Sequence, residues 1–278
     1  MEKILIIGGS GFVGKSFKEY FKKRKKIQLK SYSRSEKKDI LKINKLPKVN
    51  YIIYCIQNNN IKKSLNFFSH FKKLLQLNQK KTKILFFSSG SVYGPRYSNL
   101  KFNEKEKPSI KKINKYRGYK KKYAREKFAL EKEFKKLGNN GFQVSIIRGF
   151  TFYGKHILKD DYLISQIINS VKSKKSILIE NRNVRRSFMH AHDMCEWIIK
   201  IIKTSSNKCP IYNVGSNKIV NIEKLINFLN KKYRSKIFLN TNKSKKMDFY
   251  IPNTNLIKNK LKLKTTINFK DAISSLIN

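Results

Sequence analysis

The chain has 278 residues, of which 40% are hydrophobic, so it can bury a full core and is too long for a short binding module. Its formal net charge of +47 at pH 7 would by itself favour a polyanion such as nucleic acid or an acidic membrane surface. We expect neither as a specific partner, because the lysines are scattered through nearly every segment. RNA-recognition signatures, zinc-ligand spacings and an apolar stretch of about 20 residues are all absent from the sequence.

The three cysteines, Cys55, Cys195 and Cys209, are odd in number and far apart. This spacing favours a reduced, cytoplasmic setting over a disulfide framework. Since the sequence begins directly with an apolar run and contains no membrane-length segment, we expect no membrane insertion.

The first predicted element is a buried strand over Lys3–Ile7, followed by a glycine-rich turn and a helix. Gly8, Gly11 and Gly14 recur at every third residue of this turn. Gly8 would permit a tight turn, Gly11 would let a pyrophosphate approach the backbone, and Gly14 would let the helix pack closely on the strand. The N–H groups of the first helical turn would then face the phosphates. The segment is therefore predicted to be a dinucleotide cradle.

The rest of the first half alternates apolar, β-branched runs with segments of helical period, which is typical of a parallel sheet with crossover helices. Further strands are predicted over Ile27–Tyr32, Tyr51–Ile56, Lys83–Phe87 and Gln143–Ile147, and helices over Ile61–Leu77 and Tyr123–Leu137. After about residue 155 the regularity loosens. We therefore predict an α/β fold with a Rossmann-type doubly wound parallel sheet over residues 1–155. A smaller, partly interleaved substrate-binding region is predicted over residues 156–278, with segments at about 186–218 returning to the first domain.

Hydroxyl side chains follow the predicted strand Lys83–Phe87, in the run Ser88–Gly94. The C-terminal edge of a parallel sheet is where ligands of open α/β folds bind, so these hydroxyls are candidates for a site. Small polar residues at such a place can equally be turn formers.

Tyr123 and Lys127 stand at positions i and i+4, on one face of a predicted helix. We expect the ammonium to favour ionisation of the phenol, so that Tyr123 exchanges a proton near neutral pH. Lys127 could also hold a ribose hydroxyl, and Ser89 would hydrogen-bond the substrate oxygen that gains or loses the proton.

Tyr116 and Lys120 repeat the same spacing. Gly118 interrupts this second copy, whereas Tyr123 and Lys127 lie within a continuous amphipathic helix. Tyr123 and Lys127 are therefore predicted to be the functional pair.

Taken in order, these segments resemble the extended short-chain dehydrogenase/reductase superfamily, specifically its NAD-dependent epimerase/dehydratase group, which acts on nucleotide sugars. The matching pieces are Gly8–Gly14, Asp39 with Ile40, Ser88–Gly94, Tyr123 with Lys127, Arg148 through Gly154, Arg186 through His190, and Tyr212 through Ser216. The resemblance covers nearly the whole chain. It implies an NAD(P)-dependent enzyme with a nucleoside-diphosphate sugar as its substrate. It also implies a homodimer that pairs the two predicted helices, an expectation that their apolar faces support.

The resemblance also implies roles for single residues. Ser89, Tyr123 and Lys127 would be catalytic, and Arg186 would meet the diphosphate of the substrate with its bidentate fork. An ordinary surface arginine is the alternative for Arg186. Ser91 is a further substrate-binding candidate. The cofactor would be held by Gly8, Gly11, Phe12, Val13, Gly14, Asp39, Ile40 and Lys127, with the Phe12 and Val13 N–H groups on the pyrophosphate and Asp39 and Ile40 at the adenine.

Departures from the family pattern narrow the reaction. The 4,6-dehydratases that the chain resembles carry an acidic pair just after the catalytic hydroxyl, where this chain has Gly90 and Ser91. Dehydration and decarboxylation are therefore disfavoured, which leaves 4-epimerisation or ketone reduction. The acid that would bind a ribose 2′-hydroxyl at the end of the second strand is missing from residues 31–34, and Arg34 would suit a 2′-phosphate, which favours NADP over NAD. NADP in turn favours a nucleoside-diphosphate 4-keto-sugar reductase over a 4-epimerase.

A hypothesis of another class is a non-catalytic dinucleotide-binding sensor or an RNA-binding protein. The presence of Ser89, Tyr123 and Lys127 together argues against it. We expect no metal site, because His190 and His192 near a helix start have no acidic or cysteine partner at a useful spacing, so packing or helix capping is expected instead.

Overall fold

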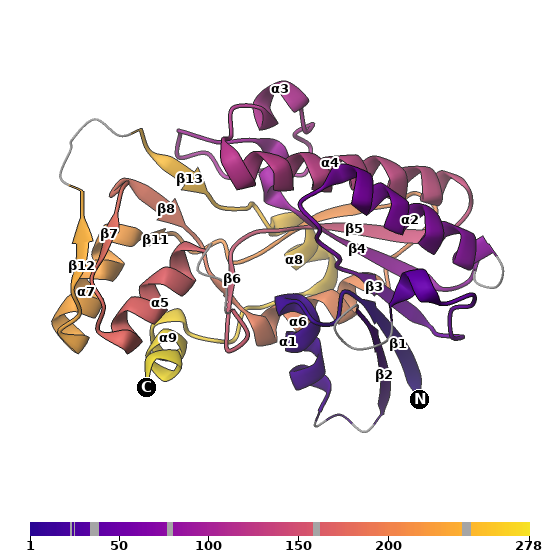
Figure 1. Ribbon diagram of the computed structural model, residues 1–278, viewed down its shortest axis with the longest axis horizontal. Helices are drawn as coiled ribbons and strands as arrows, with labels where there is room; N and C mark the ends of the chain where they lie inside the picture. The colour runs from indigo at the N-terminus through magenta and orange to yellow at the C-terminus, as the bar shows by residue number, and fades with distance from the viewer. Residues whose placement is uncertain (23, 25, 34–38, 77–79, 158–161, 241–245) are drawn as a thin grey trace.

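The structure is a computed structural model that describes residues 1–22, 24, 26–33, 39–76, 80–157, 162–240 and 246–278. Its larger part is a six-stranded sheet with helices on both faces, and a smaller part lies beyond one end of the strands (Figure 1). The first half of the chain contains β1 (Glu2–Ile7), α1 (Phe12–Phe21), β2 (Ile27–Tyr32), η2 (Ile40–Lys42), β3 (Tyr51–Tyr54), α2 (Ile61–Gln76), β4 (Lys83–Ser89), η3 (Gly90–Tyr93), α3 (Ile110–Ile113), α4 (Gly118–Asn139), β5 (Gln143–Gly149) and β6 (Phe152–Tyr153).

The second half supplies the smaller part and also completes the larger one. It contains α5 (Leu163–Ser173), β7 (Ile177–Ile179), β8 (Val184–Arg186), β9 (Met189–His190), α6 (Ala191–Ile202), β10 (Ile211–Val214), β11 (Val220–Asn221), α7 (Ile222–Tyr233), β12 (Ile237–Leu239), β13 (Asp248–Tyr250), α8 (Asn255–Leu261) and α9 (Phe269–Ile277). Of these elements, β10 joins the central sheet beside β5 and α6 packs on α1.

The central sheet has the strand order β10-β5-β4-β3-β1-β2, and each of its neighbouring pairs is parallel. The predicted doubly wound α/β fold is thus confirmed. Because β2 and β3 pair with opposite sides of β1, the strand order reverses there. In open α/β sheets ligands bind at the carboxyl ends of the strands beside such a reversal.

Successive residues of the central strands face different cores, as the two-residue period of a strand requires. Ile4 and Ile6 belong to the core under α1 and α6, whereas Leu5 and Ile7 belong to the core under α2 and α4. Figure 1 shows these two helix pairs on opposite faces of the sheet. A third core fills the smaller part, between α5, α7, α9 and the short strands β7, β8 and β12.

Several element boundaries differ from the predicted ones. β3 ends at Tyr54, because the carbonyl of Ile56 is bound by Lys127 instead of a neighbouring strand. β4 continues through Ser88 to Ser89, since β5 extends beside it to Gly149. α4 begins at Gly118, five residues before the predicted start.

The apolar faces of α2 and α4 pack on the sheet of their own subunit, where the rings of Phe134 and Phe86 stack with their centroids 4.4 Å apart. These faces therefore give no support to the expected homodimer. Toward solvent, the same two helices present several exposed cations, among them Lys62, Lys73, Arg125 and Lys132.

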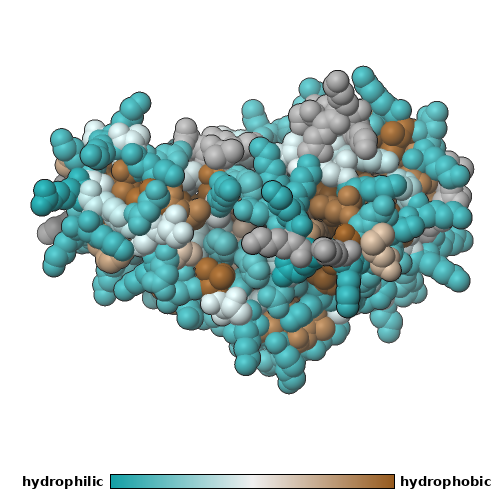
Figure 2. All heavy atoms as spheres, turned by 90° about the horizontal axis from the view of Figure 1, so that it is seen from below, coloured by the Kyte–Doolittle hydropathy of each residue, from teal (hydrophilic) through white to brown (hydrophobic). Residues whose placement is uncertain are grey.

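Figure 2 shows one face of the molecule covered largely by hydrophilic side chains, with apolar ones visible in small separate areas. Lysines spread over a surface in this way behave as a solvated shell. Among the described residues, no helix combines the length and the apolar character that crossing a membrane requires.

Candidate active site

A cleft of about 940 Å³ lies at the carboxyl ends of the central strands. Its lining joins the glycine-rich turn after β1 to residues from β4, α4, β8 and β13, and so combines both parts of the molecule. The volume is at the upper end of the range for small-molecule sites. The cleft contains every predicted site residue except Gly14 and Arg34, and Arg34 lies outside the described residues.

The glycine-rich turn has little room for side chains at two of its three positions. Gly8 has a φ of +109°, and a Cβ there would lie 2.9 Å from the carbonyl carbon of Cys55. At Gly14, a Cβ would lie 2.4 Å from the Cα of Gly9, so this glycine lets the helix pack on the turn and not, as expected, on the strand. A Cβ at Gly11 would meet the Gly8 carbonyl oxygen at 3.6 Å, an ordinary contact.

The first turn of α1 opens toward this cleft at Phe12 and Val13. Gly11 precedes the helix, and no side chain in the described part of the chain caps it. The N–H groups of a first turn lack intrahelical partners and carry a partial positive charge, which favours an anion. The cradle therefore fits a phosphate-containing cofactor.

Asp39 and Ile40 line the same side of the cleft as the end of β2. The Asp39 carboxylate accepts a hydrogen bond from the Leu41 N–H (3.1 Å) and so fixes the short helix η2. Asp39 is the one acidic side chain among the cleft-lining residues that the structure describes. At the end of β2 itself, Tyr32 and Ser33 line the cleft.

Ser89, Tyr123 and Lys127 meet in the middle of the cleft. The Ser89 hydroxyl accepts from the Ser91 N–H (3.2 Å) and lies 3.4 Å from the hydroxyl of Tyr250. The Lys127 ammonium donates to the carbonyl oxygens of Ile56 (3.1 Å) and Phe87 (3.0 Å).

The expectation that Lys127 favours ionisation of the Tyr123 phenol is wrong for this structure. Burial raises the pKa of Tyr123 well above its usual value, and the hydrogen bond from Ser89 opposes this only in part. The ammonium lies 5.8 Å from the Tyr123 ring centroid and is held by two carbonyl groups. Burial also lowers the pKa of Lys127. Tyr123 is accordingly protonated at neutral pH and suited to donate a proton.

In the alternative pair, Tyr116 is separated from the cleft. Tyr116 precedes α4 and is buried with Ile113 and Ala124 in a small core. Its partner Lys120 lines the cleft, with its ammonium 5.0 Å from the Tyr116 ring centroid. The choice of Tyr123 over Tyr116 therefore agrees with which phenol faces the cleft.

Arg186 lines the cleft on β8 and is paired with an acid, Asp248, that no sequence pattern predicted. Its guanidinium contacts the Asp248 carboxylate (2.5 Å) and donates to the backbone carbonyl of the same residue (2.9 Å). Burial alone would raise the pKa of Asp248, but the charges of Arg186 and Lys120 prevail and lower it. The expected anion-binding charge is therefore partly neutralised.

Sequence reasoning missed both Asp248 and Tyr250. They lie on β13, which pairs in parallel with β8 and places Tyr250 beside Arg186. Burial raises the pKa of Tyr250 far above its usual value. An alternating run around Phe249 is the one local signal, and three residues are too few to predict a strand or its partner.

A buried polar network binds Ser88, the residue before Ser89. Glu131 on α4 accepts a hydrogen bond from Ser88 (2.7 Å) and pairs with Arg148 through both carboxylate oxygens (3.0 and 2.8 Å). Arg148 also donates to the Tyr93 hydroxyl (2.9 Å). The hydroxyl of Ser91 is buried beside the cleft and has no hydrogen-bond partner among the described residues, which leaves it available to a ligand.

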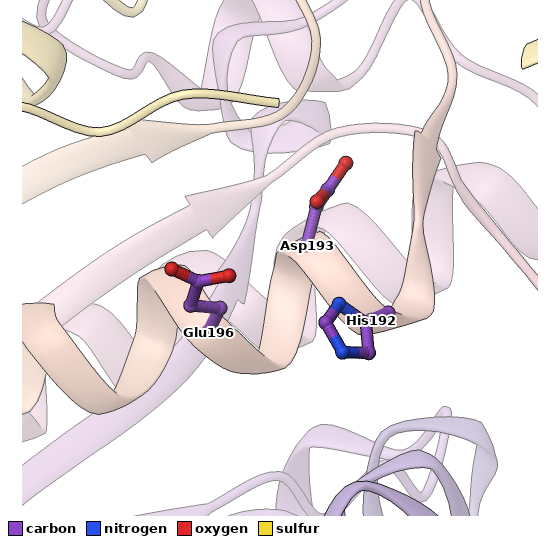
Figure 3. A group of neighbouring side chains, drawn as sticks. All are labelled: His192, Asp193 and Glu196. Atoms are coloured by element: carbon purple, nitrogen blue, oxygen red, sulfur yellow. The ribbon is translucent and has the colours of Figure 1, made fainter. Parts of the chain in front are cut away.

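Around His190 and His192, the structure agrees with the expected helix capping but differs from the expected lack of acidic partners. His190 caps α6 by accepting from the His192 N–H (3.2 Å), which confirms the capping role. Acidic partners are present, however, since ligand atoms of His192, Asp193 and Glu196 lie within 4.8 Å of one another. Figure 3 shows all three on α6, with the Asp193 carboxylate directed away from the His192 ring. The Asp193 carboxylate already accepts a hydrogen bond from the hydroxyl of Thr266 (2.7 Å). The three side chains therefore do not offer three unengaged metal ligands.

Comparison with known proteins places these features in a family. Residues 4–215 match the model of the NAD dependent epimerase/dehydratase family. No curated protein matches the chain. Similar solved structures include RMD from Pseudomonas aeruginosa complexed with NADPH, at 18% identity and a TM-score of 0.80, covering 100% of this chain and 98% of the other.

Two further structures have the same fold. The UDP-glucuronic acid 4-epimerase from Bacillus cereus, in complex with UDP-glucuronic acid and NAD, has 17% identity and a TM-score of 0.80 over 99% of this chain and 98% of the other. The dTDP-glucose 4,6-dehydratase from Bacillus anthracis, in complex with NAD, has 16% identity and a TM-score of 0.76 over 100% and 96%. At such low sequence identities, the similarity to these structures shows a shared fold and nothing finer.

Proposed function

The chain belongs to the NAD dependent epimerase/dehydratase family, and we propose that it is an NAD(P)-dependent enzyme that reduces the 4-keto group of a nucleoside-diphosphate sugar. The observation that carries this proposal is the meeting of Ser89, Tyr123 and Lys127 beside a glycine cradle in one cleft. A sensor or an RNA-binding protein would need the cradle or the surface charge, but not these three side chains.

The residues of the cradle would hold the dinucleotide. The first-turn N–H groups of Phe12 and Val13 would bind the pyrophosphate, Asp39 and Ile40 would contact the adenine, and Lys127 would hold a ribose hydroxyl. When bound, the nicotinamide supplies a hydride to a carbonyl carbon or accepts one from it.

The proton of the reaction would come from the protein. Tyr123 is protonated at neutral pH, so it would donate its proton to the substrate oxygen, while Ser89 donates a hydrogen bond that stabilises the developing charge. Ser91 would add a contact to the sugar, and Arg186 would bind the diphosphate after a change in its pairing with Asp248.

Two features support ketone reduction over elimination of water. A side chain at position 90 would have its Cβ 2.6 Å from the ring of Phe150, so an acid cannot replace Gly90 without displacing that ring. Ser91 occupies the next position, and neither residue can act as an acid–base pair. A 4-epimerase needs the same catalytic groups and no acidic pair, so it is the second candidate.

The proposal includes several finer points. NADP is favoured because residues 31–34, at the end of β2, contain no acid, and Arg34 is the residue proposed for the 2′-phosphate. Residues 1–155 would form the cofactor domain and 156–278 the substrate region. The three free cysteines favour a cytoplasmic setting. A homodimer through α2 and α4 would bring their exposed cations together, so we expect it to form at high salt and weaken at low salt.

The first experiment is a fluorescence titration of the purified protein with NADPH and with NADH at one moderate salt concentration. Tighter binding of NADPH supports the reductase, and tighter binding of NADH supports the epimerase. The second step follows oxidation of the preferred cofactor with dTDP-, GDP- and UDP-linked 4-keto sugars. Binding of neither cofactor, together with RNA binding that survives high salt, would refute the enzyme and support the RNA-binding alternative.

A further inference from the structure

Glu126 is a buried acid on the same helix as Tyr123 and Lys127, and none of the roles above uses it. The residue is 0% exposed. Its Oε1 accepts hydrogen bonds from the Asn58 N–H (3.1 Å) and the Ser64 hydroxyl (2.7 Å), whereas its Oε2 is buried and has no partner among the described residues. Burying a carboxylate with incomplete hydrogen bonding is costly, so a role in the site would account for it.

Glu126 and Lys127 bind two points of one segment, which connects β3 to α2. Lys127 donates to the carbonyl oxygen of Ile56, and Glu126 accepts from the N–H of Asn58, two residues later. Gln57 lies between these two attachments and lines the cleft. Through Ser64, the same Glu126 oxygen also fixes the first turn of α2.

We propose, on the basis of the proposed function, that Glu126 is a positioning residue. It fixes residues 56–58 against α4, so that Gln57 and the Lys127 ammonium are presented to the dinucleotide in one geometry. The segment has no regular secondary structure of its own, and the side chain of Gln57 reaches Asn59 (3.0 Å) and Tyr119. Without Glu126, the segment would lose the backbone attachment at Asn58 that fixes it on the far side of Gln57 from Lys127.

The charges around Lys127 support this role. Burial lowers the pKa of Lys127, and the charge of Glu126 acts in the opposite direction. The other titratable groups facing Lys127 are the thiol of Cys55 at the end of β3 and the phenol of Tyr123. Burial raises the pKa of Cys55 to about 12 and that of Tyr123 well above its usual value. Both are neutral between roughly pH 6 and 9, so the charge that sustains protonation of Lys127 there is that of Glu126.

Two variants separate the anchor from the charge. Glu126→Gln keeps an oxygen that can accept from Asn58 and Ser64 but removes the charge, whereas Glu126→Ala removes both. The matched control is Glu133→Gln, because Glu133 lies on the same helix and pairs with Lys136 at the surface (2.8 Å).

The first measurement needs no cofactor. Amide hydrogen exchange at Asn58, followed by NMR in the full chain, should accelerate at least about tenfold in Glu126→Ala, because the N–H loses its acceptor. It should change little in Glu126→Gln and in the control. Unchanged protection of Asn58 in Glu126→Ala would refute the anchor.

The second measurement is the dissociation constant of NADPH and NADH between pH 6 and about 9.5. In Glu126→Gln the loss of affinity at alkaline pH should begin about one pH unit lower, because Lys127 gives up its proton earlier. Glu126→Ala should also bind roughly tenfold more weakly at every pH. A merely structural role would lower the melting temperature without moving this pH profile.

The two proposals fail in different ways. If the wild-type protein binds neither NADPH nor NADH, the proposed function is wrong, and the exchange measurement still decides whether Glu126 anchors the segment. If the wild type binds cofactor and Glu126→Gln has the same pH profile, the electrostatic part of the positioning role is refuted while the proposed function stands.

Discussion

The two sides of the cleft are assembled in different ways. The side that we propose for the cofactor, the cofactor side, contains Gly8, Gly11 and Phe12, which lie close together in the chain just after β1. On the substrate side, Arg186 meets Asp248, 62 positions later, because β8 and β13 pair. A short motif can be interpreted from a single sequence, whereas a contact between two three-residue strands depends on the whole fold.

The two sides also differ in charge. The cofactor side offers uncapped N–H groups at the start of α1, which are ready for an anion. The substrate side holds Arg186 in an ion pair with Asp248, so an anion there must compete with a carboxylate. We therefore expect tight binding of the dinucleotide and weaker binding of a free nucleoside diphosphate.

The largest expected effect is on turnover, and it is expected from substitution of Tyr123, which lies where the two sides of the cleft meet. Tyr123→Phe should lower turnover by about 10²- to 10⁴-fold, because the substrate oxygen loses its proton donor. Cofactor affinity should stay within about twofold, since Phe keeps the ring. Steady-state assays and NADPH titration measure the two quantities. Tyr116→Phe is the control and should retain turnover, and full activity of Tyr123→Phe would overturn the assignment.

Away from the two sides of the cleft, the buried ion pair between Glu131 and Arg148 should stabilise the whole folded chain. Its two side chains are each 2% exposed. Glu131→Gln should lower the free energy of unfolding by about 3–5 kcal/mol, because it leaves a buried guanidinium without its counter-charge. Urea denaturation measures this loss, and Glu133→Gln should cost less than about 1 kcal/mol. Equal losses in the two variants would contradict the importance of the buried pair.

Within the cofactor side, two glycines should separate folding from binding. Gly14→Ala should destabilise the protein by about 1–3 kcal/mol, because its Cβ would lie 2.4 Å from the backbone of Gly9. Gly11→Ala should leave the melting temperature nearly unchanged, since its Cβ has an ordinary contact at 3.6 Å. It should nevertheless weaken NADPH binding, because the methyl group enters the path of the pyrophosphate. Wild-type affinity in Gly11→Ala would argue against the cradle.

The smallest effect is expected on nucleotide affinity, from substitution of Asp248 on the substrate side. Asp248→Asn should tighten binding of UDP, dTDP or GDP by about three- to tenfold, because Arg186 gains a free charge, and should leave NADPH affinity unchanged. Calorimetric titration of each nucleotide measures the change. A loss of affinity would mean that Asp248 positions Arg186 for the anion.

The pH dependence of the Arg186–Asp248 pair follows from the pKa of Asp248. Despite the opposing effect of burial, Arg186 and Lys120 lower the pKa of Asp248 in the folded protein. The stability this adds is present above the unfolded-state pKa of about 4 and is lost as pH falls through the lower, folded-state value. Asp248 should therefore cause no change in nucleotide affinity between pH 5 and 8.

Prediction from the sequence was most accurate where the signal is local. The strand Ile27–Tyr32 has its predicted bounds, and the turn after β1 has the positive φ at Gly8 that its glycine suggested. The ionisation of Tyr123 was predicted wrongly, because a spacing of four residues says which side chains are neighbours but not how deeply they are buried. The position of the Lys127 ammonium depends on the carbonyl groups of Ile56, in the segment after β3, and Phe87, on β4.

The sequence by itself determined the doubly wound sheet and the glycine-rich turn after β1, and it brought Ser89, Tyr123 and Lys127 forward as candidates, because hydrophobic period, glycine spacing and helical spacing are short-range properties. The tertiary structure alone decided that Asp248 neutralises Arg186, that Tyr250 reaches Ser89, and that Glu126 binds the segment after β3. Each of these contacts joins residues at least 62 positions apart. Such contacts form only when burial of the whole chain compensates the entropy of bringing distant segments together.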